Sequence, residues 1–196
     1  GVHEARLEAG RILARQNPVD ADVVIGVPDS GLDAALGYAQ ESGIPVAEGF
    51  LKNRYIGRTF IKPEQSSRET AVKLKLSPMR SQIEGKRVIM IDDSIVRGTT
   101  SNLITNLLRD AGAKEVHVKI SSPPFVSPCY FGTDVPDKDH LIACKMNLDE
   151  ICRHIGADSL DYLRVESLRK LVPHIKGDFC QGCFTGEYPV DIPDDV

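Results

Sequence analysis

The chain has 196 residues, of which 41% are hydrophobic and 27% charged, as expected for a soluble globular domain with one substantial core. No apolar run reaches transmembrane length and no signal-peptide segment is visible, so we expect no membrane partner and a cytoplasmic location. The net charge of −4 argues against a nucleic-acid partner. Five cysteines are an odd number, which argues against a disulfide framework.

The first fifty residues predict helices and strands in alternation. Apolar residues recur at helical spacing near the amino end, and Asn17-Pro18 stops that helix. Gly43 ends a second helix. The expected elements are a helix over 3–16, a strand over 22–27, a turn over 28–31, a helix over 32–42 and a strand over 44–48.

A basic stretch follows. From Leu51 to Arg87, ten Lys or Arg residues stand against three Glu residues, a local charge of +7 that leaves −11 for the rest of the chain. We expect a helix over 66–76 within it. A charge run of this kind is commonly a solvated face, but beside a phosphate site it would close over a polyanion.

Residues 88–101 carry the most informative pattern. Four apolar residues predict a buried strand of a parallel sheet, and Asp92 and Asp93 follow at its carboxyl end. A loop with Gly98 and several hydroxyl side chains then enters a helix, whose free backbone N–H groups suit a phosphate. Because carboxylates repel phosphate, the aspartates need a cation or donating hydroxyls, which a sugar phosphate with a metal ion supplies. An ordinary strand–turn–helix connection with a Thr cap is the alternative interpretation.

The second half continues the alternation before the pattern weakens. We expect a helix over 101–111 closed by Gly112, a strand over 115–120, helices over 147–155 and 165–172, and an extended tail over the last twenty residues. Strands that alternate with helices predict an α/β fold with a mostly parallel sheet flanked by helices. Ligands of such sheets bind beyond the carboxyl ends of the strands, where the aspartate pair lies.

Several segments together resemble one known family. The sequence DDSIVRGTTS at 92–101 is similar to the phosphoribosyl-pyrophosphate (PRPP) motif of type I phosphoribosyltransferases, in the spelling of the glutamine PRPP amidotransferases. Further similar segments are VPDSG at 27–31, KNRYIGRTF at 52–60, VHVKISSPP at 116–124, and FTG with YP at 184–189. Because they span nearly the whole chain in order, the resemblance is far more specific than any single motif.

The resemblance implies a type I phosphoribosyltransferase fold with a mobile lid and an irregular C-terminal tail. It implies transfer of the phosphoribosyl group from PRPP to ammonia, giving 5-phosphoribosylamine and pyrophosphate in the first committed step of purine synthesis. Glutamine would be the ammonia source only in the full-length enzyme. The resemblance also implies Mg²⁺ as cofactor, purine nucleotides as inhibitors and a homo-oligomer for the full-length enzyme.

The resemblance assigns roles to residues at two strand ends. Asp92 and Asp93 would hold ribose hydroxyls and Mg²⁺, with Ser30 in the metal environment. Asp29 would point away from pyrophosphate or reach the water shell of the metal. The implied substrate contacts are Asp29, Ser30 and Gly31 around the pyrophosphate, and Ser94, Ile95, Val96, Arg97, Gly98, Thr99, Thr100 and Ser101 around the 5′-phosphate.

The resemblance also implies a lid. Lys52, Tyr55 and Arg58 would face the pyrophosphate from it, with Gly57 as a hinge residue. Closure of such a loop would exclude water from a reactive cationic intermediate, and its cations would neutralise the departing pyrophosphate.

The cysteines fit more than one interpretation. The CxxC formed by Cys180 and Cys183 alone could be a metal site, a redox pair or chance. Several members of the family hold a [4Fe–4S] cluster, and Cys129, Cys180 and Cys183 match three of its ligands, while the fourth precedes the matched part. We expect Cys144 and Cys152 to be buried thiols, and the cluster to be incomplete or absent in this chain.

Nothing in the chain is similar to the glutaminase half of the family, which begins with a catalytic cysteine, whereas no Cys precedes Cys129 here. We therefore expect a phosphoribosyltransferase domain over 1–176 and a C-terminal tail with the CxxC over 177–196, with the glutaminase domain absent.

Two other functions remain open at this point. A non-catalytic PRPP or nucleotide sensor on the same fold would keep residues 88–101 but would need a nucleic-acid-binding surface, which the net acidity disfavours. A phosphoacceptor receiver domain would use the acidic pair, but the chain is too long for one and the hydroxyl-rich loop has no role there.

Overall fold

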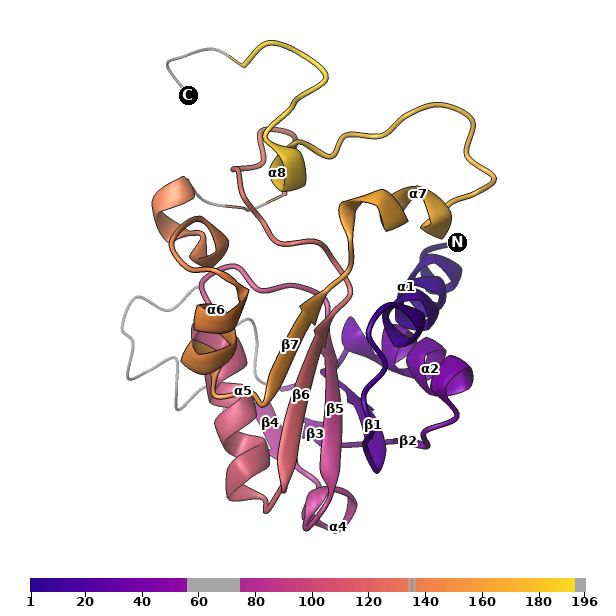
Figure 1. Ribbon diagram of the computed structural model, residues 1–196, viewed down its shortest axis with the longest axis vertical. Helices are drawn as coiled ribbons and strands as arrows, with labels where there is room; N and C mark the ends of the chain where they lie inside the picture. Colours follow the sequence, from indigo (N-terminus) through magenta and orange to yellow (C-terminus); the bar gives the residue numbers. More distant parts are fainter. Residues whose placement is uncertain (56–74, 134, 136, 193–196) are drawn as a thin grey trace.

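One parallel sheet forms the centre of the computed structural model, which describes residues 1–55, 75–133, 135 and 137–192 (Figure 1). Its strand order is β2-β1-β5-β6-β7, and every neighbouring pair is parallel. The strands are β1 (Val23–Gly26), β2 (Val46–Ala47), β5 (Arg87–Asp92), β6 (Glu115–Ile120) and β7 (Ser159–Tyr162). The predicted α/β fold with a mostly parallel sheet is confirmed.

Helices cover both faces of this sheet. On one side lie α1 (Val2–Gln16) and α2 (Gly31–Ser42), and on the other α5 (Thr99–Asp110) and α6 (Leu148–Ile155) (Figure 1). Successive residues of a strand face opposite sides, so Ile89 packs toward α1 and α2 whereas Val88 and Met90 pack toward α5 and α6. Burial on both faces explains why the strands read as continuous apolar runs.

A two-stranded antiparallel sheet stands beside the main sheet and was not predicted. It pairs β3 (Phe50–Lys52) with β4 (Leu76–Pro78), and the one-turn helix α4 (Arg80–Ile83) follows. The helix predicted over 66–76 lies outside the described residues except for its last two, and Leu76 begins β4 instead.

The C-terminal third is built from short elements. They are η2 (Lys138–His140), η3 (Ile142–Cys144), η4 (Val165–Ser167), α7 (Leu168–Leu171) and α8 (Gly182–Thr185). The predicted helix over 147–155 is α6, capped by Asn147 and Glu150 in a capping box. The extended tail is wrong at Gly182–Thr185, which forms a helical turn, and β7 was missed altogether.

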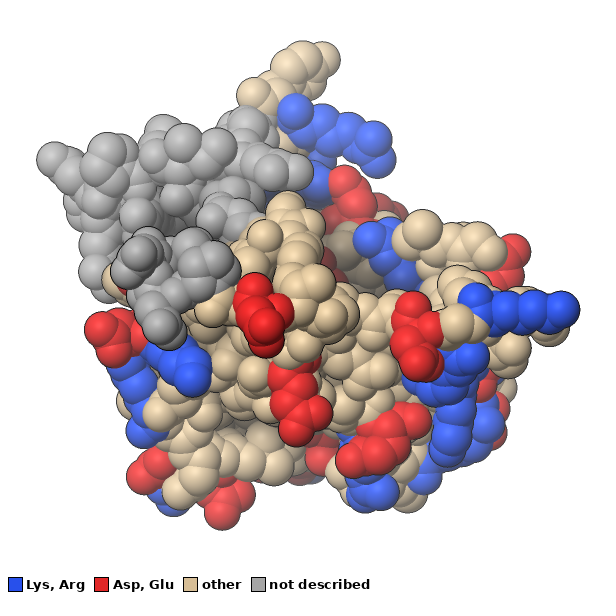
Figure 2. Space-filling model, turned by 90° about the horizontal axis from the view of Figure 1, so that it is seen from above, with Lys and Arg blue, Asp and Glu red and all other residues tan. Residues whose placement is uncertain are grey.

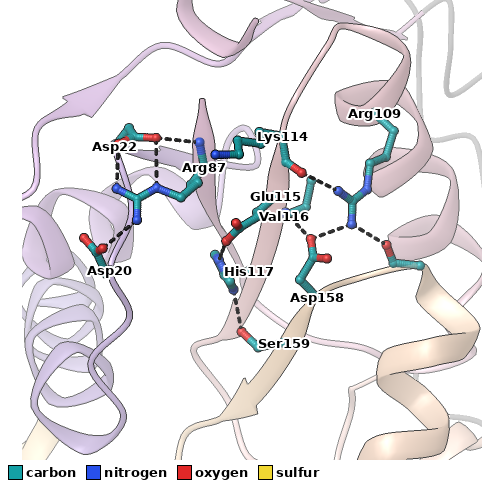
Figure 3. Close-up of polar contacts among 11 residues, drawn as sticks. Asp20, Asp22, Arg87, Arg109, Lys114, Glu115, Val116, His117, Asp158 and Ser159 are labelled. Carbon is teal, nitrogen blue, oxygen red and sulfur yellow. Dashed lines mark hydrogen bonds and ion pairs between the residues drawn. The ribbon is translucent and has the colours of Figure 1, made fainter. Parts of the chain in front are cut away.

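Charged side chains at the amino ends of the strands pair with one another (Figure 3). The Arg87 guanidinium contacts both Asp20 and Asp22, and Arg109 contacts Asp158, whose carboxylate also accepts from a β6 amide. Each of these charged groups has a partner of opposite charge, and the pairs hold the amino ends of the strands in place. We therefore assign this edge of the sheet a role in stabilising the fold. In the described ranges, no helix is long and apolar enough to cross a bilayer.

Candidate active site

The sheet reverses its order between β1 and β5. From β1 the chain moves outward to β2, and it later returns to the other side of β1 as β5. Ligands of open α/β sheets bind beyond the carboxyl ends of the strands at such a reversal, so the loops that follow β1 and β5 are the candidate site. Seen from above, this edge of the molecule carries basic and acidic side chains close together (Figure 2).

The two loops touch through Gly31. A Cβ atom on this residue would lie 2.4 Å from the carbonyl oxygen of Ile91, so a side chain has no room there. The Val27 amide donates to the same carbonyl oxygen at 2.8 Å, and the Gly31 amide donates to the Val27 carbonyl at 2.9 Å. The glycine predicted in the pyrophosphate loop thus brings the start of α2, with Ser30 before it, against the end of β5.

Asp92 and Asp93 differ sharply in environment. Asp92 is 8% exposed and accepts a 2.8 Å hydrogen bond from the Asp93 amide, whereas Asp93 is exposed and accepts from the Ser94 hydroxyl at 3.1 Å. Burial, and next the neighbouring Asp93 charge, raise the pKa of Asp92 to about 7. Within the described chain no Lys or Arg forms an ion pair with either carboxyl group, in contrast to the amino edge of the sheet.

The loop after the aspartates has apolar side chains packed inward at its centre and exposed side chains where it enters α5. Ile95 is buried in the main core and Val96 is half-buried, so only their backbone groups can meet a ligand. Arg97, Thr99 and Thr100 are exposed, whereas Ser101 is buried.

Helix α5 begins at Thr99, two residues earlier than predicted. Gly98, with a φ of 80°, occupies the cap position, and no side chain caps the helix. The ordinary Thr-capped connection is therefore not what the structure has.

Of the residues assigned to the lid, Lys52 and Tyr55 lie within the described part of the chain. Lys52, on β3, forms an ion pair with Asp29 in the loop after β1, so the two segments meet at this point. The role expected for Asp29 beside pyrophosphate stays a prediction. The Lys52 charge holds the pKa of Asp29 below its ordinary value. Tyr55 is fully exposed, and Gly57 and Arg58 lie outside the described residues.

Three cysteines gather near α8. The pKa of the Cys183 thiol is raised by burial and by the charges of Cys129 and Cys180, and backbone N–H groups lower the pKa of Cys129. Across the described ranges, however, no set of three His, Cys, Asp or Glu side chains is placed to hold a metal ion. These residues do not fit a cluster as they stand. Cys144, expected to be buried, is exposed at the end of η3.

The sequence reasoning missed two contacts that shape this site. One is the Lys52–Asp29 ion pair, and the other is the 2.8 Å hydrogen bond from the Ile142 amide to the Val96 carbonyl. Both join residues far apart in the chain, and neither partner stands in a pattern that predicts the other.

The model of the phosphoribosyl transferase domain matches residues 5–121, which include both loops and the aspartate pair. The chain belongs to the phosphoribosyltransferase family. Its resemblance to the PRPP amidotransferases is confirmed by close relatives. It is 54% identical to the amidophosphoribosyltransferase of Methanothermobacter thermautotrophicus over 195 residues, which are 100% of this chain and 41% of that protein.

Solved structures agree with this phosphoribosyltransferase fold. The glutamine PRPP amidotransferase from B. subtilis, complexed with ADP and GMP, has a TM-score of 0.88 and 52% identity, covering 99% of this chain and 44% of its own. The allosteric regulatory enzyme of purine biosynthesis has a TM-score of 0.87 and 53% identity, covering 98% of this chain and 42% of its own. The chain thus spans about two fifths of these relatives.

Proposed function

We propose that the chain transfers the phosphoribosyl group of PRPP to ammonia, releasing pyrophosphate, as the transferase part of an amidophosphoribosyltransferase of purine synthesis. The observation that carries this proposal is the pair Asp92 and Asp93, which has no cationic partner in the described chain and lies at the switch point of the sheet. It precedes an open loop in the family's PRPP motif. The names of the close relatives support the same reaction.

The chemistry requires position and charge rather than a nucleophilic side chain. The bond from the anomeric carbon to pyrophosphate breaks, the ammonia nitrogen bonds to that carbon, and the ammonium formed gives a proton to solvent. Positive charge develops on the sugar as pyrophosphate leaves. Asp92 and Asp93 would orient the ribose hydroxyls beside it, and backbone groups of 94–101 would hold the 5′-phosphate.

The carboxyl end of β5 fits Mg²⁺. Mg²⁺ takes oxygen ligands, commonly one or two carboxylates with substrate phosphates and waters, and the Asp92 carboxylate is destabilised by burial and by its acidic neighbour. Asp92, Asp93 and Ser30 would hold the ion, which when bound would neutralise charge on pyrophosphate.

The proposal extends to residues and ligands around this centre. Asp29, Ser30 and Gly31 would meet the pyrophosphate, and Lys52, Tyr55 and Arg58 would cover it. A purine nucleoside monophosphate would inhibit by placing its phosphate in the same loop, and a relative solved with ADP and GMP supports nucleotide binding. Use of glutamine and assembly into a homo-oligomer belong to the proposed whole protein.

The test is pyrophosphate release from PRPP, Mg²⁺ and ammonium at alkaline pH, where ammonia is unprotonated. We expect turnover, and Asp92→Asn should lower it at least about tenfold because a transition-state contact is lost. Asp20→Asn, a carboxylate at the opposite edge of the sheet, should leave it unchanged. PRPP binding without any turnover would replace catalysis by a sensor function, and no binding would overturn the proposal.

A further inference from the structure

A small apolar cluster supports the phosphate loop from behind. We call it the loop-side core. Its buried members are Phe125, Val135 and Leu141, and its partly buried members are Val96, Cys129, Cys183 and Phe184. Val96 is the member that comes from the phosphate loop, and the others come from two later segments of the chain. The loop-side core is separate from the two clusters on the faces of the sheet.

The turn α8 holds one of these segments in place. The Cys183 carbonyl accepts hydrogen bonds from the amides of Val126 and Ser127 at 2.9 and 3.2 Å. The Phe184 ring stacks on Phe125 with 5.1 Å between centroids. Figure 1 shows α8 beside this stretch, beyond the carboxyl ends of the strands.

The residues after α8 add a second attachment. The Tyr188 hydroxyl donates to the Pro128 carbonyl at 2.7 Å. Its ring also fills the space beside Gly182, where a Cβ atom would lie 2.3 Å from it. Residues 182–188 therefore contact the 125–128 segment through apolar packing, backbone bonds and one side-chain bond.

The loop-side core reaches the phosphate loop by two routes. The Val96 side chain packs into it, and the Val96 carbonyl accepts the 2.8 Å hydrogen bond of the Ile142 amide, next to fully buried Leu141. At the end of the loop, a Cβ atom on Gly98 would lie 2.6 Å from the Ile142 side chain. Ile142 and its neighbours thus form the back wall of the loop from Val96 to Gly98.

We propose that residues 182–188 are a positioning element of the phosphate loop, with Phe184 as its principal positioning residue. The inference rests on the proposed function. Without the Phe184 ring, the 125–128 segment and Leu141 lose a packing partner, and the wall behind Val96 loosens. The backbone groups that would meet the 5′-phosphate then lose their fixed arrangement, and affinity for a bound phosphate depends on that arrangement.

The experiment compares Phe184→Ala with wild type and with Phe184→Leu, using the whole 196-residue chain. Calorimetric titration with PRPP and Mg²⁺ should show Kd raised about tenfold in Phe184→Ala and largely restored in Phe184→Leu. Hydrogen exchange of the Ile142 amide should be faster in Phe184→Ala. Val190→Ala, an exposed position near the C-terminus, should change neither quantity.

A purely structural role would give a different result. Phe184→Ala would then melt earlier but keep the wild-type Kd and Ile142 exchange rate, which would overturn the inference. If Phe184→Ala fails to fold, Tyr188→Phe is the second variant, because it removes only the hydrogen bond to Pro128. It should raise the Kd for PRPP about two- to threefold, the loss expected for one weak hydrogen bond. An unchanged Kd in this variant would also overturn the inference. If wild type does not bind PRPP, the proposed function fails, while Ile142 exchange still reports whether Phe184 orders the loop.

Discussion

Two aspartates of this chain show how position sets the chemistry of one residue type. Asp22, at the amino edge of the sheet, accepts hydrogen bonds from Arg87, and these contacts lower its pKa to about 2. Asp92, at the carboxyl edge, is buried with no ion-pair partner among the described residues, and its pKa rises to about 7. The first carboxylate stabilises the fold. Burial makes the charged form of the second unfavourable in free energy, and such perturbed carboxyl groups are typical of ligand-binding and catalytic sites.

The raised pKa of Asp92 predicts a pH-dependent stability in the absence of divalent cations. Its folded-state pKa lies above its ordinary value of 3.8, so between about pH 4 and pH 7 the folded state holds a proton that the unfolded state has released. This contribution is fully present below that window and is lost as pH rises through about 7. Asp92→Asn should remove it, by up to about 1.4 kcal/mol per pH unit.

Urea unfolding of wild type and Asp92→Asn at several pH values measures this effect. The difference between the two proteins cancels the titration of the histidines. The variant should gain stability relative to wild type as pH rises from 5 to 8. Asp93→Asn should shift the wild-type loss of stability to lower pH. The Asp93 charge raises the pKa of Asp92, so removing that charge moves the upper end of the window below 7. A constant difference from pH 5 to 8 would contradict the buried, unpaired Asp92.

At the scale of elements, α1 and α2 meet backbone to backbone. A Cβ atom on Gly10 would lie 1.9 Å from the Ala34 carbonyl oxygen, and one on Gly37 would lie 1.9 Å from that of Leu7. Two glycines on facing helices thus allow an approach that no side chain would permit. The close contact lets α1 and α2 together cover their face of the sheet.

Gly37→Ala tests this contact by the sign of its effect. In an exposed helix, Gly→Ala stabilises by about 1 kcal/mol. Here overpacking should outweigh that gain and destabilise the protein by about 1–3 kcal/mol. Chemical denaturation measures the change, with Leu36→Ala as the exposed control on the same helix. A more stable Gly37→Ala protein would show that the helices can separate at little cost.

At the scale of the molecule, one buried ion pair joins the end of α1 to two strands. Lys119 on β6 is fully buried, pairs with Asp161 on β7 and donates to the Asn17 carbonyl at 2.8 Å. The Asn17 amide group in turn donates to Asp161. This network closes the sheet against the first helix.

Lys119→Met should destabilise the protein by about 3 kcal/mol, the lower end for a buried pair, because the partly buried Asp161 loses its cation and keeps the Asn17 amide as a partner. The double variant Lys119→Met, Asp161→Leu should recover much of that loss, since it removes both charges. Arg80→Ala, which breaks an exposed pair with Glu84, should cost less than about 1 kcal/mol. Equal losses in the single and double variants, measured by urea unfolding, would argue against a buried charge as the cause.

The fold class follows from the sequence because the buried strands β1 and β5 are apolar runs between amphipathic helices. The two-stranded sheet β3–β4 does not, since its three-residue strands are far apart in the chain. Nor does β7, whose alternating Ser159 and Asp161 give a weak strand pattern. The aspartate pair was predictable from its place at a strand end, whereas the wall behind Val96 depends on tertiary contacts alone.

The two outer strands of the sheet are short, and this has a consequence for solubility. β2 contributes two residues and directly follows Pro45, which has no N–H group to offer, and β7 contributes four. An edge so brief presents few unpaired backbone groups to another molecule. At high protein concentration, the edges of this sheet therefore offer few backbone groups for edge-to-edge pairing between molecules.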